Sequence, residues 1–156
     1  TYTYNLSLTY PIILYIGDAI VNYFLKHNVF KPIMKDGTYP IVGRGLRPVG
    51  AKNCGEFRDN FFDSSITPKL STSYGFPSGH SQCAGLFITF IYEHFRNNPY
   101  IFYPSLIYSL YIPYTRVKLG CHTIEQTIFG YIFGILTYYT FEYIHKYINK
   151  YCNKTE

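Results

Sequence analysis

The segment "YGFPSGHSQ" (74–82) joins a turn-forming tetrapeptide directly to an apolar helical pattern, "CAGLFITFIYEHF" (83–95). Pro, Ser and Gly ordinarily close a turn, but here they open a helix. A helix that begins at Ser78–Gly79 turns backbone N–H groups and the positive end of its dipole toward the motif. Gly79 has no Cβ and leaves room for a ligand. The segment therefore predicts an anion-binding helix start beside the ring of His80.

The composition indicates a single apolar domain covering residues 1–156. Hydrophobic residues make up 47% of the chain, aromatic residues 21% and charged residues only 15%, whereas soluble domains carry about 25% charged residues. The net charge of +5 is spread over loops, so a nucleic-acid partner is not expected. The four cysteines have neither a CxxC pair nor zinc-ligand spacing, and no metal site is expected.

Four apolar stretches predict an all-α, multi-pass membrane bundle with four core helices: 6–25, 81–95, 100–114 and 127–144. The first is long enough to cross a bilayer, and the middle two are either tilted spans or buried core helices. Gly130 and Gly134 form a GxxxG pattern, which either lets two helices approach closely or arises by chance.

The connections between these stretches bring three polar segments to one end of the bundle: 26–76, 77–80 and 115–126. Two guanidinium groups there match phosphate oxygens. Two histidines supply a nucleophile and a proton donor for phosphoryl transfer. Singly, each residue has a plainer explanation, such as an interface anchor or a helix cap. The combination favours a phosphate site built from Arg47, Arg116, Lys118, His80, His122 and the Ser78–Gly79 backbone.

Three motifs in order, "LRP" (46–48), "PSGH" (77–80) and "TRVKLGCHTIEQ" (115–126), resemble the signature of the type 2 phosphatidic acid phosphatases and their haloperoxidase relatives. That signature reads Lys-x6-Arg-Pro, Pro-Ser-Gly-His and Ser-Arg-x5-His-x3-Asp. The second motif is complete, and the third keeps Arg116 and His122 at the family spacing.

The resemblance implies a metal-independent membrane phosphatase acting on a lipid phosphate or diphosphate, with no cofactor and with its site facing a lumen or the exterior. His122 would be the nucleophile that forms a phosphohistidine, and His80 the general acid. The phosphate would be held by Arg47, Arg116, Ser78 and Gly79.

The third motif departs from the family at Gln126, where Asp is expected. An amide oxygen can still orient the ring of His122, and Glu125 is a nearby alternative for this role. Gln at this place, together with "GFPSGHSQ", resembles the dolichyl diphosphatase branch. A polyprenyl diphosphate is therefore the first expected substrate class, and phosphatidic acid the second.

The first motif departs at its lysine, because the expected position falls on Pro40. The segment "NYFLKH" (22–27) resembles the helix end that carries the family lysine, which assigns this role to Lys26. The other basic residues that remain open for it are Lys31, Lys35 and Arg44.

Three further residues carry open expectations. Asp18 either faces the bundle and pairs with a basic partner, or lies near the end of a shifted span. Cys54 and Cys121 are expected at the active end, where they can pair in an oxidising compartment, although free buried thiols are the expected state.

Two other functions fit the same motifs. The departures at the Asp and Lys positions also suit an inactive relative that binds lipid phosphates or serves as a structural membrane protein. A vanadate-dependent haloperoxidase would use the same anion pocket, but membrane embedding argues against it.

Overall fold

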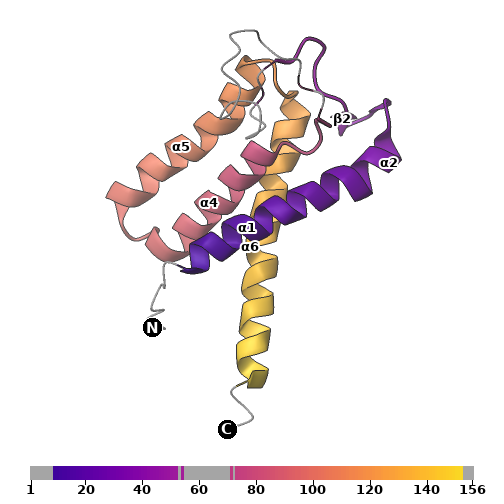
Figure 1. Cartoon of the computed structure of the whole chain (residues 1–156). Helices are drawn as coiled ribbons and strands as arrows, with labels where there is room; N and C mark the ends of the chain where they lie inside the picture. The colour runs from indigo at the N-terminus through magenta and orange to yellow at the C-terminus, as the bar shows by residue number, and fades with distance from the viewer. Residues whose placement is uncertain (1–8, 53, 55–70, 72, 153–156) are drawn as a thin grey trace, which may run out of the picture.

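The computed structural model describes residues 9–52, 54, 71 and 73–152, and within these ranges the chain is mainly helical (Figure 1). The four expected helices are present: α1 (Thr9–Phe24), α4 (Gly79–Phe95), α5 (Pro99–Lys118) and α6 (Ile124–Cys152). α1 continues through a π-helix, η1 (Leu25–Phe30), into the short α2 (Lys31–Met34). The sequence did not predict this π-helical continuation.

Helix starts follow from local capping chemistry. The side chain of Ser78 accepts a hydrogen bond from the backbone N–H of Ser81 at the start of α4. Asn98 does the same for Tyr100 at the start of α5, where Pro99 occupies the first turn. Pro suits this position because its missing N–H would have no helical partner there. The tight turn between α4 and α5 returns the chain toward the long loop.

α4 and α6 are in close contact because glycines remove side chains from their interface. A Cβ on Gly130 would overlap the backbone carbonyl of Ser78, and one on Gly134 would overlap that of Gln82. The GxxxG pattern is therefore confirmed as a packing feature. α4 also packs on α5, and α1 crosses both α4 and α6 (Figure 1).

The long loop after α2 has structure of its own. β1 (Thr38–Tyr39) and β2 (Gly43–Arg44) pair as a short antiparallel hairpin that the sequence analysis did not predict. Farther along, the N–H groups of Gly75 and Phe76 both donate to the carbonyl of Gly45, each at 3.0 Å. These bonds join the beginning of the loop to its end and bring both beside the start of α4.

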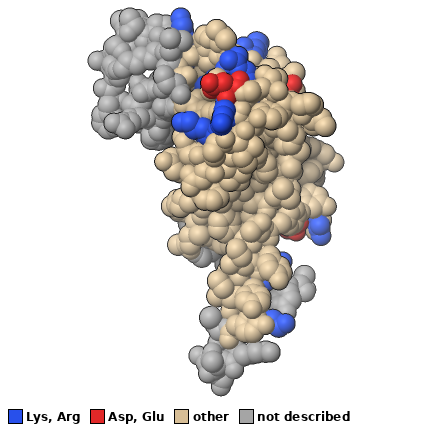
Figure 2. Space-filling model, turned by 90° about the vertical axis from the view of Figure 1, so that its right-hand side faces the viewer, with Lys and Arg blue, Asp and Glu red and all other residues tan. Residues whose placement is uncertain are grey.

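The outer surfaces of the helices expose many large apolar side chains, among them Ile12, Ile13, Ile16, Ile20, Ile107 and Leu110. Figure 2 shows a face whose middle is almost free of charged side chains, with Lys, Arg, Asp and Glu near its two ends. Within the stretch 6–25, expected to span a bilayer, residues 9–24 form the 16-residue α1. Among the described residues, we find no helix that combines the length and the apolar character needed to cross a membrane.

Candidate active site

A cavity of about 450 Å³ lies where α1, the start of α4 and the α5–α6 connection meet. The polar side chains that line it come from distant parts of the sequence, as the bundle topology predicted. They include Asp18, Asn22, Lys26, Arg47, His80 and His122.

His122 is buried, and its protonation pattern follows from its neighbours. Its Nδ1 lies 3.0 Å from Oε1 of Gln126. The Nε2 of that amide donates to the carbonyls of Arg44 and Leu46, at 2.7 Å each. Because the amide nitrogen faces those two acceptors, its oxygen must face His122 and accept the proton of Nδ1. The unprotonated nitrogen of the neutral ring is then Nε2.

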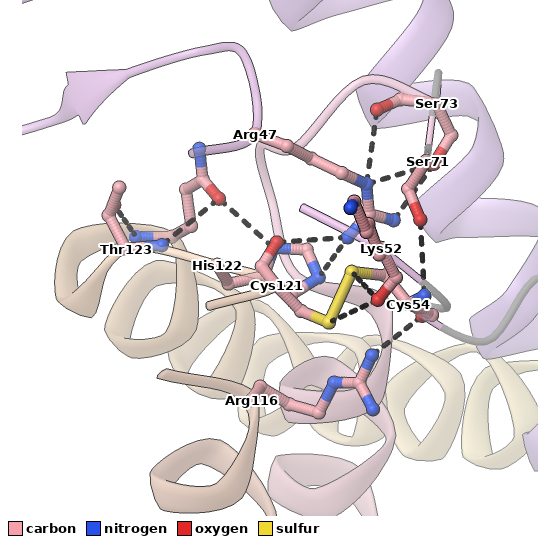
Figure 3. Close-up of a disulfide and its surroundings, with 10 residues drawn as sticks. Arg47, Lys52, Cys54, Ser71, Ser73, Arg116, Cys121, His122 and Thr123 are labelled. Carbon is pink, nitrogen blue, oxygen red and sulfur yellow. Dashed lines mark hydrogen bonds between the residues drawn. A yellow bond between two sulfur atoms is a disulfide. The ribbon is translucent and has the colours of Figure 1, made fainter. Parts of the chain in front are cut away.

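Arg47 reaches the same ring from the other side (Figure 3). Its Nη1 lies 3.0 Å from Nε2 of His122 and donates to the carbonyl of Cys121 at 3.0 Å. Nε and Nη2 both donate to Oγ of Ser73, at 3.1 and 2.8 Å. An arginine can only donate, so this contact independently makes Nε2 the acceptor.

The surroundings of His122 keep it neutral. Burial, and then the positive charge of Arg47, lower the pKa of His122 to about 3, while the hydrogen bond from Nδ1 to Gln126 opposes this shift. A ring that is neutral at physiological pH, with a lone pair on Nε2, meets the requirement for a nitrogen nucleophile.

Gln126 also donates hydrogen bonds, which explains why an amide stands where the family signature has Asp. A carboxylate at this position would have no N–H group for the carbonyls of Arg44 and Leu46. Glu125 takes no part in orienting His122. Its side chain lies against Gly43, and its carboxylate is hydrogen-bonded to Thr123.

Ser78 is turned away from the cavity, which corrects its expected role as a phosphate ligand. Its side chain is fully buried and caps α4, and its N–H donates to the carbonyl of Gln126 at 3.0 Å. Gly79 and His80 line the cavity instead. Their N–H groups belong to the first helical turn, which has no carbonyl partner within the helix.

The ring of His80 is exposed to the cavity. Desolvation by the surrounding pocket, and then the charges of Arg116 and Arg47, lower the pKa of His80 below its usual value. A bound phosphate anion would offset both arginine charges and raise that pKa again. The pKa of His80 therefore depends on whether an anion occupies the cavity.

Arg116 does not line the cavity, but it is bonded to Cys54, which does, and its set of partners is incomplete. Its Nη2 donates to the carbonyl of Cys54 at 2.6 Å. Its Nε is buried and has no hydrogen-bond partner within the described part of the chain. A buried donor without an acceptor is costly, so this guanidinium group retains an unused donor for a further acceptor.

Of the four candidates for the first-motif cation, Lys26 lines the cavity, whereas Lys31, Lys35 and Arg44 do not. Lys26 is the second residue of η1, two residues after α1 ends. π-helical turns are frequent at functional sites.

A polar chain that the sequence analysis missed joins α1 to α4. Gln82 is fully buried, and its Nε2 donates to the carboxylate of Asp18 at 2.8 Å and to its backbone carbonyl at 3.3 Å. Asn22 donates from Nδ2 to Oε1 of Gln82 at 2.8 Å. Asp18 thus faces the bundle, but its partner is an amide and not the expected basic residue. The spacing of Asp18, Asn22 and Lys26 by four residues is the signal that could have identified this helix face.

Cys54 and Cys121 form a disulfide across 67 residues of sequence, with their Cα atoms 5.4 Å apart. The expectation of free thiols at these positions was wrong, because the folded loop brings both side chains together at the active end (Figure 3).

A smaller apolar cavity of about 130 Å³ adjoins the polar one between α1 and α4. The two share Tyr15 and Cys83 as wall residues, and the smaller is lined further by Pro11, Leu14, Leu86, Phe87 and Phe90. Within the described residues, no group of three or more His, Cys, Asp or Glu side chains gathers as a metal site would require.

Comparison with known proteins adds a family and a fold. The sequence matches the model of the PAP2 superfamily over residues 14–150. The fold is similar to the crystal structure of the first transmembrane PAP2 type phosphatidylglycerolphosphate phosphatase from Bacillus subtilis, with a TM-score of 0.56 and 18% sequence identity. The similarity covers 88% of this chain and 58% of that one, so this chain spans little more than half of its length. No curated protein matches the sequence.

Proposed function

Because the chain belongs to the PAP2 superfamily, we propose that it is a phosphatase that hydrolyses a lipid phosphate or diphosphate through a phosphohistidine at His122. The observation that carries this proposal is the protonation pattern of that ring, with the proton on Nδ1 and the lone pair on Nε2. Gln126 accepts from Nδ1, and Arg47 donates toward Nε2 at the cavity wall. The lone pair of Nε2, which we propose as the nucleophile, therefore lies beside Arg47, a cation suited to bind phosphate.

In the first step, Nε2 of His122 attacks phosphorus, and the bond to the leaving oxygen breaks. Arg47 leaves its contact with Nε2 and binds phosphate oxygens, together with Arg116, Lys26 and the N–H groups at the start of α4. His80, protonated once the anion has bound, gives its proton to the leaving oxygen. Proton transfer avoids expulsion of an alkoxide, or of a fully charged lipid phosphate if the substrate is a diphosphate.

In the second step, water attacks the phosphohistidine. The neutral His80 takes a proton from that water, the nitrogen–phosphorus bond breaks, and inorganic phosphate leaves. His122 returns to its neutral form with the proton still on Nδ1, where Gln126 holds it. These residues carry the chemistry without a metal ion.

Two features support a lipid as the substrate and a membrane as the setting. The apolar cavity between α1 and α4 shares Tyr15 and Cys83 with the polar one, which supports a phosphate beside His122 with its hydrocarbon tail against this apolar side. α1 and α5 expose several isoleucine and leucine side chains, and exposed apolar side chains that cluster on a surface mark membrane or protein contacts. We propose a multi-pass membrane protein with the apolar cavity opening toward lipid.

The substrate class and the orientation are finer parts of the proposal. The use of Gln126 in place of Asp supports the dolichyl diphosphatase branch, and hence a polyprenyl diphosphate before phosphatidic acid. The disulfide between Cys54 and Cys121 supports a site that faces an oxidising compartment, such as an organelle lumen or the exterior.

The test is a phosphate-release assay on detergent-solubilised protein with a polyprenyl diphosphate, phosphatidic acid and phosphatidylglycerolphosphate. We expect release from at least one of them, inhibition by vanadate, no loss of activity in EDTA, and background rates for His122→Ala because its nucleophile is gone. Folded protein that releases no phosphate from any of them would support an inactive, lipid-phosphate-binding relative. Activity that EDTA abolishes and a divalent ion restores would contradict the mechanism.

A further inference from the structure

The disulfide lies directly against the phosphate-binding groups (Figure 3). Cys121 immediately precedes His122, and its carbonyl accepts from Nη1 of Arg47 at 3.0 Å. The carbonyl of Cys54 accepts from Nη2 of Arg116 at 2.6 Å. Each of the two arginines is therefore bonded to the backbone of one of the two bridged cysteines.

The two ends of the bridge are anchored unequally. The N–H groups of Cys121 and His122 both donate to the carbonyl of Arg116, at 3.0 and 3.2 Å, so the turn after α5 fixes Cys121 without help from the bridge. Cys54 lies in the long loop, where its N–H donates to Oγ of Ser71 at 3.1 Å. The bridge is thus the covalent link that ties the Cys54 backbone to the helical bundle.

We propose that Cys54 and Cys121 are positioning residues for phosphate binding, and that the bridge holds the Cys54 carbonyl where it orients Arg116. The Nε of Arg116 is already buried without a partner within the described residues. Without the Cys54 carbonyl, a second donor of this half-buried guanidinium group would lose its acceptor, and the side chain would turn toward another one. The phosphate site is then competent only in the disulfide form.

Reduction should therefore lower activity. A dithiol gives two electrons and two protons to the sulfur–sulfur bond and closes to its own disulfide, which leaves two cysteine thiols in the protein. Both cysteines are buried, but Cys54 lines the polar cavity. The reductant can approach from that side, and an anion bound in the cavity should slow the reaction.

The experiment compares the Cys54→Ser/Cys121→Ser double variant with the wild type, each with and without Arg116→Ala. We expect the double variant to lose about 10- to 100-fold in kcat/KM, the scale of a misplaced binding group, with a parallel rise in the vanadate concentration needed for inhibition. In the Arg116→Ala background the same two substitutions should cause little further loss, because their target is already absent.

Stability must be separated from positioning. A bridge that closes a 67-residue loop also stabilises the fold, so each assay is run well below the unfolding midpoint of its variant. Should the double variant not fold, dithiol reduction of the folded wild type gives the same comparison, and reoxidation should restore activity. The residual activity of a folded double variant should not respond to the dithiol.

The activity readout of this inference rests on the proposed function. Vanadate binding, measured by the rise in unfolding temperature that it causes, tests the inference without turnover. A wild type that binds vanadate and hydrolyses no lipid phosphate would overturn the proposed function alone. An active wild type whose double variant keeps full kcat/KM and vanadate inhibition would overturn the inference alone. An equal loss with and without Arg116 would also overturn it, because the bridge would then act through the fold in general.

Discussion

Two buried glutamines, Gln126 on α6 and Gln82 on α4, are built into the site in the same way but with different partners. Each amide nitrogen donates to two oxygen acceptors, which turns the amide oxygen toward a residue of the cavity. Gln126 directs its oxygen to His122, and Gln82 directs its oxygen to Asn22. Both orientations can be assigned because a backbone carbonyl never donates.

The difference lies in what fixes each amide. Both acceptors of Gln126 are backbone carbonyls, held by the folded long loop. One acceptor of Gln82 is the carboxylate of Asp18, a side chain on a helix that borders a cavity. The amide that orients His122 is thus fixed by backbone carbonyls, whereas the amide that contacts the α1 side of the cavity is fixed in part by a side chain. We therefore expect changes on the His122 side to affect chemistry, and changes on the α1 side to affect binding and stability.

The largest effect should come from Gln126→Glu. A carboxylate has no N–H group for the carbonyls of Arg44 and Leu46. Repelled by these two oxygens, it would turn away from them and displace the ring of His122. We expect kcat to fall by about 100-fold, the scale of a reacting group that is misplaced by about 1 Å. Gln126→Leu, which removes the same hydrogen bonds without adding a charge, is the matched control for the carboxylate charge.

The pH profile sharpens this prediction. The nucleophile must be unprotonated, and the low pKa of His122 keeps it so in the wild type. A carboxylate beside the ring favours the imidazolium and raises that pKa. Between about pH 7 and about pH 5, Gln126→Glu should therefore lose activity through protonation of this ring, whereas the wild type should not. Identical acid limbs in both proteins would contradict the assignment of His122.

A smaller effect on turnover is expected for Gln82→Leu. Asp18 and Asn22 would lose their shared partner, and leaving buried polar groups unsatisfied costs about 1–3 kcal/mol of folding free energy. KM should rise by about tenfold with little change in kcat, since misplaced wall residues weaken binding and leave the nucleophile in place. The control Asp18→Asn keeps an acceptor oxygen for Gln82 and should have a much smaller effect. A fall in kcat without a rise in KM in Gln82→Leu would contradict the expected difference between the two sides of the site.

The smallest effect on chemistry should come from Gly134→Ala on the α4–α6 interface, compared with Gly17→Ala on α1. A Cβ at Gly134 meets the backbone of Gln82, whereas one at Gly17 meets the end of the Phe141 ring, which can move. We expect Gly134→Ala to cost about 1–3 kcal/mol by overpacking, and Gly17→Ala to be nearly neutral, because Ala gains about 1 kcal/mol in helix propensity. Denaturant unfolding measures both, and equal costs would contradict the distinction between the two interfaces.

The sequence predicted the four helices and the gathering of His80, His122 and Arg47 at one end of the bundle, because apolar stretches and short turns determine bundle topology. Contacts made by the long loop could not be predicted in this way. Whether Ser78 faces a ligand or a neighbouring helix depends on the glycine interface, and the pairing of Cys54 with Cys121 depends on how the loop folds back. Local patterns do not contain that information.

The contacts missed on α1 have a different cause. An amide such as Gln82 has no distinctive spacing, so its link to Asp18 appears only once two helices cross. The motif shows that Gln126 stands where the family has Asp, but it does not give the reason. The position must donate as well as accept, and only the folded loop reveals the two carbonyls that receive its hydrogen bonds.

The central claim is that His122 carries phosphate during turnover, and chemical trapping tests it most directly. Protein mixed with a labelled lipid phosphate and quenched in alkali should retain label that is stable in base and lost in acid, as a nitrogen–phosphorus bond requires. Peptide mapping should place the label on His122, and His122→Ala should carry none. Label on another residue, or turnover by the wild type that proceeds with inversion at phosphorus in a single displacement, would contradict the account.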